Sequence, residues 1–131
     1  MAGNADTIKK GFDSFNSGDI DGLDEVWADD VRWEGSGSEE LPGGGTHEGK
    51  QAVMQMAGAI AEQWESFQAQ PDEFVEDGDT VVVLGRLEGR SKQGNDVKVP
   101  FVHVWRMEGG QGKRVQALTD SLQLARALGV S

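Results

Sequence analysis

The chain begins with apolar positions spaced three or four residues apart, which is the period of an amphipathic helix. Over residues 5–16 this spacing predicts a first helix, whose start Asn4 or Asp6 can cap. Ser17-Gly18-Asp19 ends that helix. Residues 20–27 repeat the same stripe in a shorter helix, which we expect to pack against the first across a tight turn.

The next segment changes from strand to loop chemistry. Val31-Arg32-Trp33-Glu34 alternates like a short strand. Residues 35–49 contain six glycines and Pro42 with almost no aliphatic side chain, which predicts a loop that is either a lid or simply mobile. From Lys50 a third helix is predicted, with a broad apolar face that extends to Phe67.

After the third helix the apolar period changes to two. The strands that it predicts, separated by turn sequences, lie at about 68–76, 80–90, 97–108 and 114–119. A closing helix is predicted over residues 121–128 and is ended by Gly129. Helices followed by consecutive strands, without β-α-β alternation, predict an α+β fold in which helices cover one face of a curved antiparallel sheet.

The strand over residues 97–107 is apolar on both faces. Its two sets of positions are Val97, Val99, Phe101 and Trp105 on one face, and Val102 and Val104 on the other. Only one face can pack on the helices, so the other needs a different cover. We therefore expect a homodimer formed through the sheet.

Composition narrows the class of protein. With 131 residues, 37% apolar positions, four Trp and five Phe, the chain has the size and core material of one domain spanning residues 1–131. The absence of cysteine excludes disulfides and thiolate chemistry and favours a reducing compartment, so we expect a cytoplasmic protein. The polar opening and the short apolar runs predict neither a signal peptide nor a membrane span.

Charge is strongly negative and unevenly distributed. The formal net charge is -11; residues 1–80 hold 19 acidic and 4 basic residues, whereas residues 81–131 hold 4 acidic and 8 basic residues. Such a field repels phosphate backbones and anionic lipid. We therefore expect no nucleic-acid partner and no membrane partner.

Four segments of the chain together resemble one superfamily. They are FNSGDIDGLDEVWADDVRW (15–33), GTHEGKQAV (45–53), VPFVHVWRM (99–107) and TDSLQLARAL (119–128). They resemble the nuclear transport factor 2-like superfamily and, within it, the SnoaL-like and ketosteroid isomerase-like branch. The resemblance covers nearly the whole chain and implies a cone-shaped, cystatin-like α+β fold that encloses one deep, mostly apolar pocket. Its members include steroid isomerases, polyketide cyclases, epoxide hydrolases and non-catalytic binding modules.

The catalytic groups of these enzymes do not carry over to this chain. The ketosteroid isomerase pattern implies Gly11 at the position of its tyrosine, Val102 at its oxyanion-binding acid and Gly35 at its base. The epoxide hydrolase pattern implies Ala117 in place of an acid. The site has therefore either been rebuilt with other groups or binds without turnover.

Three polar residues are the candidates for catalysis. Glu34, beside Trp33, is the candidate general base, with a solvated strand-end glutamate as the structural alternative. His103 is a candidate for proton transfer, but alternation places it opposite Val102, which favours a hydrogen-bonded histidine at an interface. Asp120 is the third candidate, although Asp-Ser-Leu-Gln before an apolar run is typical of a helix N-cap.

A pocket of the kind that the resemblance implies would be lined largely by aromatic residues. Which face of the 97–107 strand lines it is left open by the sequence. Arg106 ends the same face as Val102 and Val104, where it either binds an anionic ligand group or pairs with the acidic N-terminal half. The candidate lining residues are Phe12, Phe15, Trp27, Trp33, Phe101, Val102, Val104, Trp105, Arg106 and Ala117.

No metal or cofactor is expected. His47 and His103 are isolated and offer no ligand spacing. Residues 44–51 approach a phosphate-loop pattern, but Gln51 replaces the magnesium-binding hydroxyl and no strand precedes the segment. Nucleotide binding is therefore not expected.

Two functional hypotheses remain. The first is an enzyme that catalyses proton transfer, isomerisation or cyclisation of a hydrophobic, carbonyl-containing molecule of polyketide or steroid type. The second is a non-catalytic small-molecule-binding or dimerisation module of the same fold. Because the catalytic acids of ketosteroid isomerases are missing, the second hypothesis has nearly as much support as the first.

Overall fold

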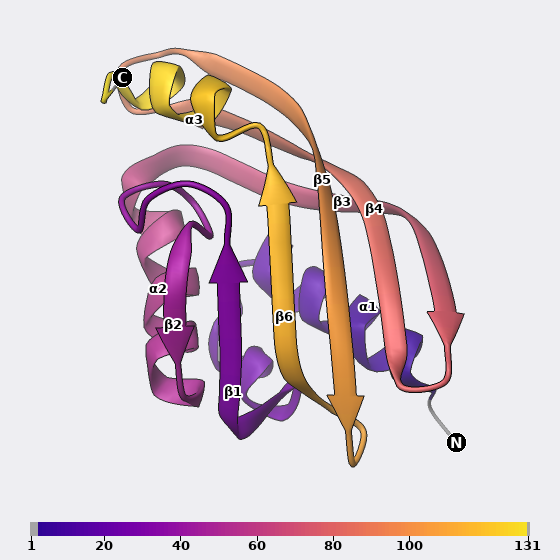
Figure 1. Cartoon of the computed structure of the whole chain (residues 1–131). Helices are drawn as coiled ribbons and strands as arrows, with labels where there is room; N and C mark the ends of the chain where they lie inside the picture. Colours follow the sequence, from indigo (N-terminus) through magenta and orange to yellow (C-terminus); the bar gives the residue numbers. More distant parts are fainter. Residues whose placement is uncertain (1–2, 131) are drawn as a thin grey trace.

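The computed structural model describes residues 3–130 and shows helices and a sheet in the order that the sequence predicts (Figure 1). The helices are α1 (Asn4–Asn16), the short 3-10 helix η1 (Asp21–Glu25), α2 (Lys50–Gln63) and α3 (Ser121–Leu128). The strands are β1 (Trp27–Gly35), β2 (Gly45–Glu48), β3 (Trp64–Asp77), β4 (Thr80–Ser91), β5 (Asp96–Glu108) and β6 (Gln111–Thr119).

The six strands form one curved, open sheet in the order β2-β1-β6-β5-β4-β3 (Figure 1). The α+β fold class is confirmed, but the expected purely antiparallel sheet is corrected to a mixed one, because β1 pairs with β6 in parallel. The remaining pairs are antiparallel. The parallel pair arises because β1 precedes α2 in the chain and enters the sheet beside its last strand.

Two helix predictions need correction. The second predicted helix is only the five-residue η1, since β1 already begins at Trp27. The third ends at Gln63, and Trp64 and Phe67 belong to β3. The three-residue spacing of these two aromatic residues resembles a helix face because the register of β3 shifts between Trp64 and Ser66.

The glycine-rich segment is pinned rather than free. Residues 45–48 form the edge strand β2, and the turn before it is held where Trp33 Nε1 donates a hydrogen bond to the Gly43 carbonyl oxygen at 2.7 Å. Leu41 in this turn is buried. A Cβ at Gly35 would lie 1.7 Å from the Gly43 oxygen, so only glycine allows this close approach.

The helices α1 and α2 lie against one face of the sheet, here called the inner face, and α3 crosses one end of the sheet (Figure 1). On β5 the odd-numbered positions from Val99 to Met107 are buried, whereas Lys98 and Arg106 are exposed on the outer face. No helix among residues 3–130 is long and apolar enough to span a membrane.

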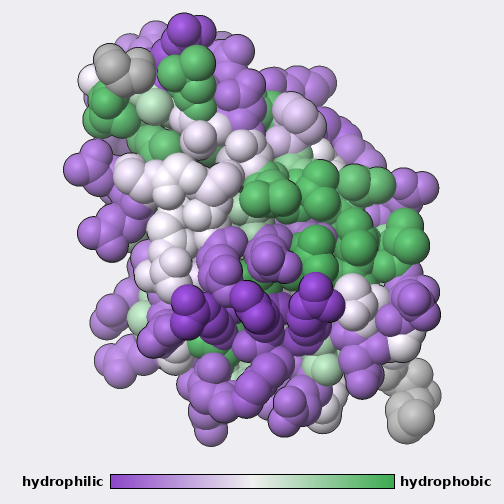
Figure 2. Space-filling view, viewed as in Figure 1, coloured by the Kyte–Doolittle hydropathy of each residue, from purple (hydrophilic) through white to green (hydrophobic). Residues whose placement is uncertain are grey.

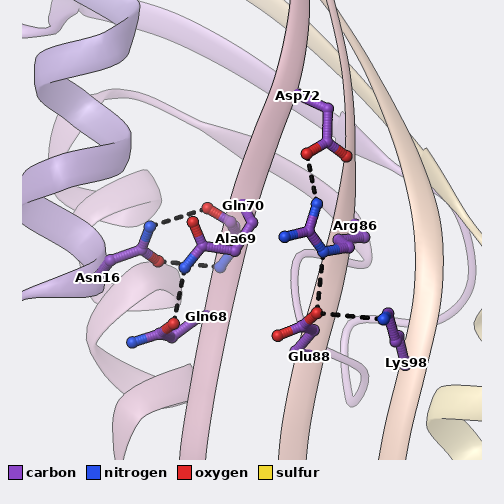
Figure 3. Close-up of polar contacts among 8 residues, drawn as sticks. All are labelled: Asn16, Gln68, Ala69, Gln70, Asp72, Arg86, Glu88 and Lys98. Atoms are coloured by element: carbon purple, nitrogen blue, oxygen red, sulfur yellow. Dashed lines mark hydrogen bonds and ion pairs between the residues drawn. The ribbon is translucent and has the colours of Figure 1, made fainter.

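An amide side chain docks α1 on the edge strand β3 (Figure 3). Asn16 Nδ2 donates to the Ala69 carbonyl oxygen at 2.9 Å, and the Ala69 backbone N–H donates to Asn16 Oδ1 at 2.9 Å. The N–H and C=O groups of Ala69 point away from β4, and both are hydrogen-bonded to the side chain of Asn16. The contact fixes α1 over the inner face, where the pocket lies.

Candidate functional site

A pocket lies between the inner face of the sheet and the helices, with a cavity of about 90 Å³. Every helix except α3, and every strand except β2, contributes to its wall. The wall residues include Gly11, Phe12, Phe15, Leu23, Val26, Trp27, Trp33, Met56, Ala57, Ile60, Phe67, Ala69, Leu87, Phe101, His103, Trp105 and Ala117.

Aromatic rings surround the imidazole of His103. Phe12 of α1 stacks on it with centroids 5.6 Å apart and 28° between the planes. Trp33 of β1 meets it edge to face at 5.3 Å, and Phe101 of β5 lies tilted at 4.7 Å. The side chain is only 8% exposed. His103 is therefore held from three elements in an apolar surrounding.

The imidazole of His103 has one hydrogen-bond partner among the described residues. Trp105 Nε1 donates to His103 Nδ1 at 3.3 Å, within the buried part of the wall. Burial in this aromatic surrounding lowers the pKa of His103 from 6.5 to about 3. The imidazole is consequently neutral at physiological pH.

Other polar groups of the pocket wall are already paired. Ser36 Oγ accepts a hydrogen bond from the Thr119 backbone N–H at 3.0 Å, and Thr119 Oγ1 donates to the Pro100 carbonyl oxygen at 2.8 Å. Trp27 differs, because its Nε1 is buried with no acceptor among the described residues. His103 is the single ionisable side chain of the wall within residues 3–130.

The structure decides which face of β5 lines the pocket. Phe101, His103 and Trp105 line it, whereas Val102 and Val104 lie on the outer face. The expectation that Val102, Val104 and Arg106 are lining residues is therefore corrected, as is the placement of His103 on the far face. The ketosteroid isomerase pattern places Val102 at a position that faces the pocket. A shift of one residue along a strand moves a side chain to the opposite face.

Arg106, at the end of the outer face, serves neither of the roles considered from sequence. Its Nη1 donates to Thr80 Oγ1 at 3.5 Å, and no carboxylate within residues 3–130 forms an ion pair with it. It cannot contact a ligand in the pocket from this face.

Glu34 and Asp120 do not join His103 at the pocket. Glu34 alternates with the inward-facing Trp33, and its Oε1 forms ion pairs with Arg32 Nε at 3.1 Å and Arg114 Nη2 at 2.8 Å. Asp120 caps α3, where its Oδ1 accepts a hydrogen bond from the Gln123 N–H at 3.2 Å. The three candidates thus occupy three separate places, and only His103 lines the cavity.

One known domain family matches most of this chain. The model of the SnoaL-like domain matches residues 8–115, which is most of the chain. This chain belongs to the SnoaL-like domain family. The resemblance seen in the sequence is confirmed, and a search of curated proteins gives no significant match.

Solved structures with the same fold cover nearly the whole SnoaL-like domain. An NTF2-like protein of unknown function from Burkholderia pseudomallei K96243 has 29% identity and a TM-score of 0.87, covering 98% of each chain. TerC, co-crystallised with polyporic acid, has 28% identity and a TM-score of 0.86, covering 96% of this chain and 98% of its own. An NTF2-like protein from Burkholderia xenovorans LB400 has 30% identity and a TM-score of 0.82, covering 95% of each chain.

The SnoaL-like pocket lacks a functional side chain at two positions where the resemblance implies catalytic groups. Gly11, at the position of the tyrosine, and Ala117, at the position of an acid, both line the cavity. No cluster of three or more His, Cys, Asp or Glu residues able to hold a metal occurs in the described part of the chain.

The sequence pattern does not predict the walls supplied by α2 and β3. Met56, Ala57 and Ile60 of α2 and Phe67 and Ala69 of β3 line the cavity, although their apolar spacing predicts only core positions. Neither helical nor strand spacing distinguishes a core residue from a pocket residue. On β5 the one additional signal is that both aromatic residues, Phe101 and Trp105, stand on the same face as His103.

Proposed function

We propose that this SnoaL-like domain binds a small, mainly apolar, ring-containing molecule in the pocket between α1, α2 and the sheet. One observation carries the proposal: a cavity is walled by aromatic side chains, and among residues 3–130 its wall holds one ionisable side chain, that of His103. Apolar concave sites with few, well-placed polar groups are typical of small-molecule sites. The apolar wall supplies affinity and the imidazole supplies orientation.

The size of the cavity limits what fits. Its volume of about 90 Å³ is below the roughly 150 Å³ of an apolar cavity that binds benzene. A ring-sized ligand therefore extends toward the surface and displaces partly buried wall residues, of which Phe15, Met56 and Phe67 are examples. Methionine is well suited to such repacking because its side chain is unbranched and flexible.

A related protein supports the class of ligand. TerC, at 28% identity over 96% of this chain, was co-crystallised with polyporic acid. Rings and carbonyl oxygens are the features that an aromatic wall with one polar side chain would accommodate. We therefore place aromatic ketones and quinones first among the ligands to test.

Titration with 1-indanone, followed by tryptophan fluorescence, tests the proposal. Ala117→Leu adds a side chain at the cavity wall beside His103, so it should abolish saturable binding while the far-ultraviolet circular dichroism is retained. Gln116→Leu introduces the same side chain one residue earlier, on the outer face, and should bind as the unmodified chain does. Equal binding by both variants, or no binding by the unmodified chain, would refute the proposal.

Catalysis by a carboxylate base is the weaker of the two hypotheses. Neither Glu34 nor Asp120 lines the cavity, and the described wall holds no other carboxylate. We expect no exchange of the α-protons of bound 1-indanone with deuterated water above the buffer rate. Exchange that Glu34→Gln abolishes without loss of binding would restore the isomerase hypothesis.

We also propose that a second copy of the chain covers the outer face of the sheet. Figure 2 shows an apolar patch on this face. Adjacent pairing positions on β3 to β6 supply it, namely Val75, Val82, Leu84, Val102, Val104 and Leu118. An apolar strip of this kind across four strands is typical of a protein interface.

Charge favours a second acidic copy on this face over any other face. The chain carries a net charge of -11, so most approaches between two copies are repulsive. Beside the patch, however, two acidic residues are paired with basic ones: Asp72 with Arg86, and Glu88 with Arg86 and Lys98 (Figure 3). Here two copies meet on apolar and neutralised surface.

Sedimentation equilibrium tests the dimer. Val75→Lys places a charge in the patch without touching the cavity wall and should shift the population toward monomer, whereas Leu122→Lys on α3 changes an equally exposed aliphatic residue and should not; the two are 51% and 52% exposed. A chain that remains monomeric at millimolar concentration, or a dimer unaffected by Val75→Lys, would overturn this assignment.

A further inference from the structure

The hydrogen bond between two wall residues fixes where the imidazole proton lies. The indole Nε1 of Trp105 is always a donor, since it carries a hydrogen and no available lone pair. It points at His103 Nδ1 at 3.3 Å, so Nδ1 must present its lone pair. In a neutral imidazole the proton is then on Nε2.

The other ring nitrogen faces no protein acceptor. Within residues 3–130, no hydrogen bond joins His103 Nε2 to another group, and the ring lines the cavity. We propose that Trp105 fixes His103 as a neutral, Nε2-protonated imidazole, so that the pocket offers its ligand a hydrogen-bond donor and no base. The selection of a ligand rests on the proposed ligand-binding function, whereas the tautomer of His103 does not depend on it.

The surroundings contain nothing that would hold a second proton on the ring. The neighbours on each packed element are Phe12 of α1, Trp33 of β1, Val83 of β4, Ala117 of β6, and Phe101 and Trp105 of β5. None of them is charged or titratable. Burial accordingly lowers the pKa of His103 to about 3, in agreement with the neutral form.

The free N–H of His103 then selects a chemical class of ligand. The ring lines the cavity, and its Nε2 has no acceptor within residues 3–130. An N–H group without a partner calls for an acceptor such as a ketone or quinone oxygen. A hydrocarbon of the same shape leaves this donor unpaired and should bind more weakly.

Nitrogen-15 NMR of the ligand-free chain tests the tautomer directly. The chain has two histidines, so His47→Gln assigns the signals of His103. We expect His103 Nδ1 to resonate as an unprotonated nitrogen and Nε2 as a protonated one, unchanged from pH 7 to pH 5. A protonated Nδ1, or a ring that becomes cationic in this range, would overturn the proposal.

Two tryptophan variants separate positioning from packing. Trp105→Phe removes the donor and should give a mixture of the two tautomers. Trp33→Phe also removes an indole beside His103, but that indole donates to the Gly43 carbonyl oxygen, so the tautomer should stay fixed. A fixed tautomer in Trp105→Phe would show that Trp105 does not position the ring. The spectrum of the unmodified chain decides the tautomer even if a variant fails to fold.

A matched pair of ligands tests selection. We expect 1-indanone to bind about three- to tenfold more tightly than indane, which corresponds to one net hydrogen bond. His103→Phe should remove that preference, so that 1-indanone and indane bind with equal affinity. Equal affinities in the unmodified chain would refute selection of an acceptor. If neither compound binds, the proposed ligand-binding function fails, while the NMR spectrum still decides the tautomer.

Discussion

The buried imidazole of His103 makes the stability of the fold depend on pH. Its pKa is lowered from 6.5 to about 3 by burial, so between these values the unfolded chain binds a proton that the folded chain does not. The free energy of unfolding therefore falls as pH decreases from about 6.5 toward 3, by up to about 1.4 kcal/mol per pH unit from this residue.

Urea unfolding at several pH values checks this dependence. His103→Phe replaces the imidazole with a ring that cannot titrate, so its free energy of unfolding should fall less steeply between pH 6 and pH 4. Carboxylates contribute equally to both proteins and cancel in the difference. Parallel curves for the two proteins would mean that His103 titrates normally in the folded state.

A single glycine sets the position of the turn that follows β1. Gly35→Ala would place a Cβ 1.7 Å from the Gly43 carbonyl oxygen, a backbone atom that cannot move without breaking the turn. We expect a loss of about 3 kcal/mol, near the upper end for overpacking. Gly58→Ala is the control, because nothing lies within 4 Å of its new Cβ on α2; it should stabilise by about 0.5–1 kcal/mol. Thermal unfolding measures both, and equal effects would contradict this account.

Single residues were predictable in type more often than in direction. Aromatic residues such as Phe12 and Trp33 were expected at the pocket and line it. The sequence identifies His103 by its chemistry but places it on the wrong face of β5. Because β5 is apolar on both faces, alternation alone does not show which face the helices cover. The ion pair of Glu34 with Arg114 joins residues far apart in the chain, so no local pattern contains it. The cap formed by Asp120, in contrast, is the alternative that its local sequence pattern predicts.

The edge strand β3 depends on one side chain of α1. Asn16 makes two hydrogen bonds of 2.9 Å with the backbone of Ala69, which shields part of an open strand edge. Asn16→Ala should cost about 1–3 kcal/mol because it leaves these groups unpaired. Asn4→Ala on the same helix removes only a weak exposed contact of 3.5 Å with Gly78 and should stay within about 0.5 kcal/mol. Chemical denaturation tests the difference, and equal losses would contradict it.

The helix α3 depends on its cap. Asp120→Ala removes the acceptor for the Gln123 N–H and should cost about 1 kcal/mol, whereas Asp120→Asn should retain most of the stability. Binding of 1-indanone, measured by tryptophan fluorescence, should be the same in both variants, because Asp120 does not line the cavity. Loss of binding in a folded Asp120→Asn variant would instead place the residue in the site.

Elements with strong local signals were predicted closely. α3 spans Ser121–Leu128, the predicted range, because an Asp cap and a terminal glycine bound its apolar stripe. The sequence predicts a helix as far as Phe67, beyond the end of α2, because a bulge in β3 places Trp64 and Phe67 at a helix-like spacing. The parallel pairing of β1 with β6 joins residues far apart in the chain, so no local pattern contains it.

For the whole molecule, the sheet divides two tasks between its faces. The inner face and the helices enclose the aromatic cavity, and the outer face carries the apolar patch from Val75 to Leu118 and its surrounding ion pairs. The family was recognisable from four sequence segments together, since they include β2, α3 and most of β1 and β5, which lie far apart in the chain. The choice between catalysis and binding was not predictable from the sequence, since it depends on which polar side chains meet at one cavity.

Mapping the binding site of 1-indanone by NMR chemical shifts tests the central claim most directly. On β5 the inner-face residues Phe101, His103 and Trp105 line the cavity, while Val102 and Val104 face away. We predict saturable shifts at the first three side chains, the largest at His103 Nε2–H, and little change in the side-chain methyl groups of the two valines. Saturable shifts confined to the valines or to the ion pairs of Glu34 would contradict the account.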